Sequence, residues 1–378
     1  KEKDQVFLHT GPHHDDIMLG IFPCITPQLR EASNKFHFTI CTSGFTAVTN
    51  EMLMNYMVET LAHVEQDKIN MIEYPDFFEK GYMYKFDKDV SHYLNKIAAN
   101  DEAGKLRGLC HRIVRVMVGI YKLNSRQELE EQLRKNIELL KSSYGGQKNP
   151  PDIQKLKGML REFEEELVWA HYGVRVRDIQ HLRLGFYTGD IFTPQPSAKR
   201  DVEPILEMFR EVRPTVVSMA YDPEGSGPDT HYKVLKAIAQ ALRVWKEEED
   251  LSKLRIIGYR NVWFKFHPSE ANVFTPVSLN SMAVLNWSFK NCYISQVNAS
   301  FPSYEFDGPF SDLSQKVWVE QFRKIQLILG KDFFYDNESP KIRATHGMIY
   351  YRDMSTEEFL LQARSLEKSM EGDILYEG

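Results

Sequence analysis

The chain has 378 residues, of which 42% are hydrophobic and 26% are charged, a composition typical of a globular protein with a large core. Its net charge of −6 argues against the basic surface that nucleic-acid-binding proteins carry, so we expect no nucleic-acid partner. No apolar run is long enough to span a bilayer, and no secretory signal opens the chain. The four cysteines are widely scattered, which favours a reducing compartment and predicts a cytoplasmic location.

The first predicted unit is a strand at residues 6–10, which leads through a polar cluster into a helix-like apolar run from Ile17. The cluster holds two imidazoles and two carboxylates in a row, His13, His14, Asp15 and Asp16. Ligands of open α/β sheets bind at the carboxyl ends of strands. Histidine and aspartate at such a place can hold a divalent transition ion and leave positions open for water, as metal-assisted hydrolysis requires. The alternative is that Asp15 or Asp16 only caps the helix.

A second strand at residues 36–42 completes a βαβ unit and predicts parallel pairing. Residues from about 51 to 155 read as a helical insertion, in which Ser125 and Glu128 form a capping box. By the same strand-end argument, the insertion should pack near the mouth of the site, as a lid or an interface. A purely structural outgrowth is the alternative.

Strand and helix patterns then alternate again. Strands are predicted at 179–184, 214–220 and 254–259, and helices at 202–212 and 232–246. Further helices are expected at 280–292, 312–329 and 355–369. The whole chain, 1–378, is therefore predicted to be one α/β domain with a Rossmann-like, mainly parallel sheet and helices on both faces. The insertion and a helical C-terminal extension at about 305–378 complete this prediction.

The loop at residues 222–231 repeats the arrangement of the opening cluster. A hydrophobic strand ends, a loop rich in glycine and proline carries aspartate and histidine, and a helix begins. Parallel strands bring their carboxyl ends to one edge of the sheet. His231 is therefore expected to meet His13 and Asp16 there, around one ion.

In these two clusters the sequence resembles the LmbE-like zinc deacetylases, the N-acetylglucosaminyl deacetylase (PIG-L) family. The family's first motif, His-Pro-Asp-Asp-Glu, stands here as His13-His14-Asp15-Asp16-Ile17. The resemblance implies that His13 and Asp16 bind the metal and that Asp15 is the general base. It also implies that His231, at the end of residues 227–231, is the third ligand. Weaker matches are Thr42-Ser43-Gly44, residues 161–174, and Ser295-Gln296.

The function implied by the resemblance is zinc-dependent removal of an N-acetyl group from an N-acetylglucosamine-type amino sugar, with Fe²⁺ or another divalent ion as the alternative cofactor. Two positions of the first motif differ, and a histidine that helps to stabilise the oxyanion in the family has no counterpart beside His231. His267 is the candidate substitute, with an ordinary loop histidine as the alternative. His14 either orients a metal ligand or is a solvent-facing loop residue.

In some bacteria a domain of this family is joined to a glucosamine-6-phosphate deaminase domain. The start at Lys1, without methionine, is compatible with a piece of such a longer polypeptide. Two rival functions stay open at this point, a sugar-phosphate deaminase or isomerase and a non-catalytic sugar-binding or scaffolding module. A homo-oligomer is also considered. Surface solvation is the simpler explanation for the basic residues that could receive a phosphate, Lys199, Arg200, Arg260 and Lys265.

Overall fold

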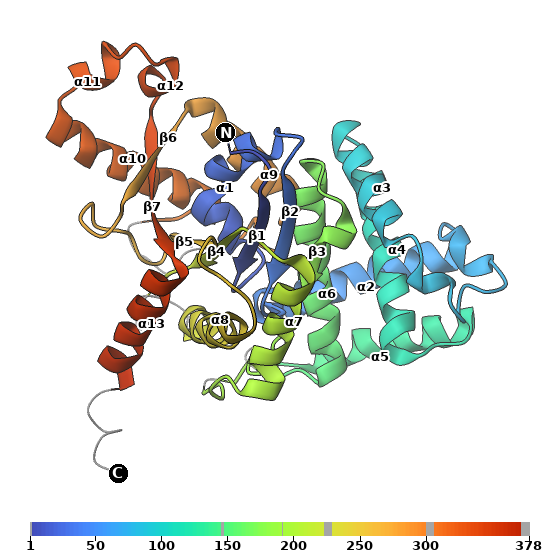
Figure 1. Cartoon of the computed structure of the whole chain (residues 1–378). Helices are drawn as coiled ribbons and strands as arrows, with labels where there is room; N and C mark the ends of the chain where they lie inside the picture. Colours follow the sequence, from blue (N-terminus) through green and yellow to red (C-terminus); the bar gives the residue numbers. More distant parts are fainter. Residues whose placement is uncertain (1, 145–146, 191, 223–228, 300–305, 372–378) are drawn as a thin grey trace.

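The centre of the fold is a seven-stranded sheet, seen in a computed structural model that describes residues 2–144, 147–190, 192–222, 229–299 and 306–371 (Figure 1). The strand order is β3-β2-β1-β4-β5-β7-β6. The first five strands are β1 (Val6–Gly11), β2 (Lys35–Ile40), β3 (Ile179–His181), β4 (Val216–Ala220) and β5 (Arg255–Tyr259). They are all parallel and follow the order 3-2-1-4-5 of doubly wound sheets.

This topology creates a switch point between β1 and β4. From β1 the chain moves outward to β2 and β3, and it then returns to place β4 on the other side of β1, with Phe7 opposite Val216. The strands are buried because apolar residues dominate them, as in β4, where all five residues are buried. Loops that leave the carboxyl ends of β1 and β4 therefore open into one crevice.

Helices cover both faces of the sheet. One apolar cluster joins it to α1 (Asp16–Leu29), α6 (Pro151–His171) and α9 (Leu279–Cys292). A second cluster joins the opposite face to α7 (Glu203–Val212), α8 (Asp229–Glu248) and α13 (Thr356–Glu371). The predicted fold class, a mainly parallel α/β sheet with helices on both faces, is confirmed. No helix in the described part of the chain combines the length and apolar character needed to cross a membrane.

The region predicted as an insertion is helical. It holds α2 (Asn50–Glu65), α3 (Phe86–Ala98), α4 (Glu102–Tyr121) and α5 (Arg126–Ser142), which group beside α6 at the β3 side of the sheet (Figure 1). The Ser125 hydroxyl caps α5 by accepting from the Glu128 N–H at 3.2 Å. The Glu128 carboxylate reaches back to the N–H of Asn124 at 2.8 Å, one residue before the position that a standard capping box uses.

The expectation of a helical C-terminal extension is wrong in one respect. Three helices come first, α10 (Phe310–Leu329), α11 (Asp332–Tyr335) and α12 (Pro340–Arg343). A nine-residue strand, β7 (Gly347–Ser355), then precedes the final helix. It pairs antiparallel with β5 and with β6 (Val273–Val277), a strand that was not predicted. The β5 and β7 partners lie about a hundred residues apart in the chain, so no local sequence pattern predicts their pairing.

Candidate metal centre

His13 and Asp16 are positioned by the turn that joins β1 to α1. Asp16 is the first residue of α1, and its Oδ2 accepts the backbone N–H of His13 at 2.7 Å. Its Oδ1 accepts from Nδ2 of Asn261, in the loop after β5, at 2.6 Å. Asp15 occupies the N-cap position, but its side chain makes no capping hydrogen bond. The capping alternative therefore does not account for the side chain of Asp15.

His231 arrives from the first turn of α8, after β4. Of the loop predicted at 222–231, residues 223–228 lie outside the described part of the chain, but both of its ends are described. Nδ1 of His231 lies 2.8 Å from Oδ2 of Asp222, which fixes the ring orientation. Nε2 of His231 then faces Asp16, with 3.3 Å to Oδ2, and this buried nitrogen has no hydrogen-bond partner among the described residues.

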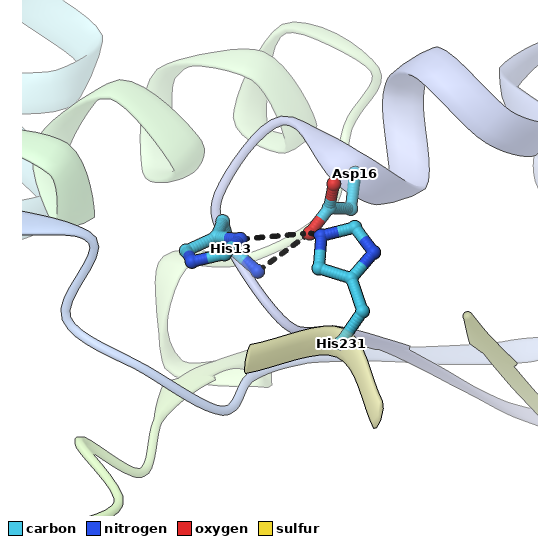
Figure 2. A group of neighbouring side chains, drawn as sticks. All are labelled: His13, Asp16 and His231. Atoms are coloured by element: carbon cyan, nitrogen blue, oxygen red, sulfur yellow. Dashed lines mark hydrogen bonds and ion pairs between the residues drawn. The ribbon is translucent and has the colours of Figure 1, made fainter. Parts of the chain in front are cut away.

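The three predicted ligands converge (Figure 2). One donor atom from each of His13, Asp16 and His231 lies within 4.8 Å of the others. Two of the separations are 3.4 Å, from His13 Nδ1 to Asp16 Oδ2, and 3.3 Å, from His231 Nε2 to the same oxygen. Bonds of about 2.0–2.1 Å to a tetrahedral ion put neighbouring ligand atoms roughly 3.4 Å apart. The chemistry of the three donors and two of their separations therefore fit one divalent ion.

The electrostatics of the cluster point the same way. Burial works to raise the pKa of Asp16, but the neighbouring imidazoles of His231 and His13 outweigh it and hold that pKa below its ordinary value. Burial works to lower the pKa of His231, yet Asp16 and Asp222 more than offset it and raise the pKa to about 10. Protonated His231 therefore places a positive charge between the carboxylates of Asp16 and Asp222. A divalent ion bound here would supply that positive charge instead, and His231 would release its proton.

Asp15 stands beside the cluster without joining it. It lines a cavity of about 150 Å³ together with His13 and Asp16. Its Oδ1 accepts from Nη2 of Arg161 at 3.1 Å, and Nη1 of this buried arginine reaches Glu164 at 2.7 Å. Asp15 is therefore placed as a largely buried carboxylate next to the donor set, held by an arginine from α6.

The weaker sequence matches meet at the same cavity. Gly44 of the loop after β2, with φ of +56°, lines it, and so does Gln296. Ser295 accepts from Arg161 Nη1 at 3.0 Å and donates to Glu164 at 2.8 Å. At Gly44, a Cβ would come within 3.1 Å of Nδ1 of His14, so the close approach of the loop favours glycine there.

Two histidines that the sequence singled out take other places. His14 is fully buried, not a solvent-facing loop residue, and its ring stacks on His181 with 5.6 Å between ring centroids. Neither of its ring nitrogens has a hydrogen-bond partner among the described residues, so the structure shows no hydrogen bond through which it would orient a metal ligand. His267 is exposed, contacts Ser269 at 2.7 Å, and is not among the residues that line the metal cavity. The structure therefore gives no support to His267 as an oxyanion donor.

Sequence reasoning missed three residues at the site. Asp222 orients His231, Asn261 holds Asp16, and Tyr187 lines the cavity with its ring 5.7 Å from that of His13. Asp222 and Asn261 both follow carboxyl ends of parallel strands, β4 and β5. The strand-end argument that selected His13 could have selected them as well. Tyr187 carried no comparable signal.

Comparisons with known proteins give the following. No family model matches the chain. A glucosamine-6-phosphate deaminase-like protein of Bacteroides thetaiotaomicron is 27% identical over 144 residues, which are 37% of this chain and 21% of that protein. The chain thus matches about a fifth of the length of this curated relative.

Two solved structures are also similar. The zinc-inhibited form of teicoplanin deacetylase Orf2 is 11% identical with a TM-score of 0.43, and the similarity covers 92% of this chain and 98% of that one. The N,N'-diacetylchitobiose deacetylase from Pyrococcus horikoshii is 13% identical with a TM-score of 0.40, covering 94% and 85%.

Proposed function

We propose that this chain is a metal-dependent N-deacetylase of an amino sugar, a member of the N-acetylglucosaminyl deacetylase family. The observation that carries the proposal is the convergence of His13, Asp16 and His231 beside a carboxylate that is not part of the donor set, Asp15. Metal-assisted amide hydrolysis needs this combination of a three-residue ion site and a separate base. The motif resemblance adds the acetylated amino sugar as the substrate class.

His13, Asp16 and His231 would hold the ion, with zinc as the proposed metal. When bound, such an ion lowers the pKa of a water molecule and polarises the acetyl carbonyl. Asp15 takes a proton from the attacking water and returns it to the nitrogen of the leaving amine. Arg161 fixes the orientation of Asp15 through the 3.1 Å hydrogen bond to Oδ1.

The tetrahedral intermediate needs a hydrogen-bond donor for its oxyanion. Tyr187 is better placed than His267 to be this donor, because it lines the cavity and its ring lies against that of His13. Its hydroxyl is already within 2.6 Å of Oγ1 of Thr46, an exposed residue, so the hydroxyl is held at the cavity wall. Gln296 is a second polar group at the same wall.

The cellular setting is proposed on sequence grounds. The cytoplasmic location, a homo-oligomer and a fusion to a glucosamine-6-phosphate deaminase domain stay predictions. The partial match to a glucosamine-6-phosphate deaminase-like protein supports the last of these.

Acetate release by the purified chain tests the proposal. Zinc-loaded protein is incubated with N-acetylglucosamine, N,N'-diacetylchitobiose and N-acetylglucosamine 6-phosphate, and with an N-acetylated amino acid as control. We expect acetate from at least one sugar, loss of the activity on chelation, and recovery when metal is restored. Turnover that persists in fully chelated protein, or no acetate with zinc, iron or manganese, would contradict the proposal.

A further inference from the structure

A second, larger cavity adjoins the metal cavity. Its volume is about 1,090 Å³, against about 150 Å³ for the cavity at the donor set. Thr46 lines both, from the short helical turn η1 (Phe45–Ala47) that precedes α2. The small cavity is below the roughly 300–1,000 Å³ that sites for small molecules usually occupy. Part of a sugar substrate must therefore extend beyond it, and the larger cavity is adjacent.

Lys157 is the unusual side chain of this second cavity. It lies on α6, is only 5% exposed, and lines the cavity. Its Nζ donates to Oδ1 of Asn50 at 2.6 Å, and no described carboxylate forms an ion pair with it. Burial lowers its pKa to about 8, so the amine is still mostly protonated near neutral pH. A buried ammonium without a counter-ion is costly, and a bound anion would offset that cost.

The other basic groups nearby are already neutralised. Lys148, which lines the same cavity, pairs with Asp190 at 2.6 Å, and Lys141 pairs with Glu138 at 2.9 Å. The same holds for two residues that the sequence offered for phosphate, since Arg260 pairs with Glu270 and Lys265 with Glu320. Lys157 differs from all of these residues in having a neutral partner, and it differs from Lys141 and Lys148 in being buried.

The position of Lys157 relates it to the metal centre. It precedes Arg161 by four residues on α6, so the two side chains emerge from one face of the helix with a rise of about 6 Å between them. Arg161 holds Asp15, the proposed base. A hexose with its acetamido group at the metal cavity could bridge one helical turn and bring a substituent to Lys157.

We propose that the cavity beside the metal centre binds an anionic substituent of the substrate, a phosphate ester or a carboxylate, through the ammonium group of Lys157. This inference rests on the proposed function, because it defines the substrate class of that same site as acidic amino sugars. The rival explanation is that Lys157 only ties α2 to α6 through Asn50, the first residue of α2. A purely structural tie would not discriminate between charged and neutral sugars.

Calorimetry with the deacetylated products tests the inference without requiring turnover. The probes are glucosamine, glucosamine 6-phosphate and 2-amino-2-deoxyglucuronate, titrated into zinc-loaded protein of residues 1–378. A charge-assisted hydrogen bond should make at least one acidic sugar bind about 10- to 100-fold more tightly than glucosamine. The acid that gains affinity identifies the substituent. Equal or weaker binding of both acidic sugars by the native chain overturns the inference.

Matched variants then assign the effect. Lys157→Met should remove the preference for the acidic sugar and leave the affinity for glucosamine unchanged, whereas Lys148→Met should keep the preference. A Lys157→Met variant that retains the preference, or that weakens glucosamine equally, contradicts the assignment. If Lys157→Met does not fold, Lys157→Gln takes its place. The comparison of acidic and neutral sugars on the native chain still tests the inference. A Lys157-dependent preference for an acidic sugar without any acetate release would refute the proposed function and retain only the anion-binding site.

Discussion

Arg161 donates a hydrogen bond from Nη2 to Oδ1 of Asp15 at 3.1 Å, although 146 residues separate the two in the chain. The side chain of Arg161 is 1% exposed and also pairs with the fully buried Glu164. One arginine therefore balances two carboxylates at the edge of the metal cavity. It links α6, which follows the helical insertion, to the turn at the start of α1.

We expect Arg161→Met to lower the free energy of unfolding by about 3–5 kcal/mol, because removing one partner of a buried ion pair leaves the other charge uncompensated. Urea denaturation provides the measurement. Arg134→Met is the matched control, since Arg134 also pairs with a carboxylate, Glu65, but both of these side chains are nearly half exposed. That control should cost no more than about 1 kcal/mol. Equal losses in the two variants would contradict the buried-pair explanation.

Asp15→Asn should reduce the rate of acetate release by about 10²- to 10⁴-fold, since an amide cannot accept the proton from water. The metal content should stay at the native level, because Asp15 is not one of the three converging residues. Steady-state kinetics and elemental analysis of the same preparation measure both effects. Near-native turnover in Asp15→Asn would exclude this residue as the base, and loss of metal would make it a ligand.

His231→Ala should abolish stoichiometric metal binding, which in the native chain we expect to be about one ion per chain. Two protein ligands do not retain a catalytic zinc ion as three do. His267→Ala serves as the control, because His267 is exposed and does not line the metal cavity. It should keep both metal and activity. A full metal complement in His231→Ala would refute the ligand assignment.

Asp222→Asn should weaken the metal site without abolishing it. Asp222 contacts Nδ1 of His231 at 2.8 Å and so keeps Nε2 directed at the donor set. Loss of such an outer carboxylate typically lowers metal affinity by about 10- to 100-fold. Competition with a chromophoric chelator measures the change. Native affinity in Asp222→Asn would show that the ring is held by its packing alone.

Glu165 should contribute stability that is present at low pH and is lost as pH rises through the window between its unfolded and folded pKa values. Burial raises the pKa of this carboxyl from 4.5 to about 8, and its partners are the Trp169 indole N–H and the Tyr293 hydroxyl. Between these two values the unfolded chain releases a proton that the folded chain keeps, so the unfolded state binds fewer protons and stability decreases with rising pH. The contribution levels off outside the window.

Glu165→Gln tests this expectation, because the amide cannot ionise and can still pair with Trp169 and Tyr293. The unfolding free energy of the native chain minus that of the variant should fall as pH rises, as measured by urea denaturation between about pH 5 and pH 8. The two proteins share every other titrating group. Parallel pH profiles would show that Glu165 does not titrate in this window.

Short-range patterns in the sequence determined the parallel half of this protein and the choice of its site. Strand and helix periods around residues 6–29 and 214–248 place His13, Asp16 and His231 after two strands. Because the carboxyl ends of parallel strands meet at one edge of the sheet, the three residues are expected to lie together. These inferences needed only local periodicity and a general rule about parallel sheets. The structure brings the same three residues together.

Only the tertiary structure decided the remaining features. β7 enters the sheet beside β5, about a hundred residues away in the chain, and the role of Arg161 depends on a contact across 146 residues. Burial decided others, since Lys157 and Glu165 look like ordinary charged positions of a helix until packing removes them from water. Long-range pairing and desolvation arise from the assembled chain, so neither leaves a periodic signal in the sequence.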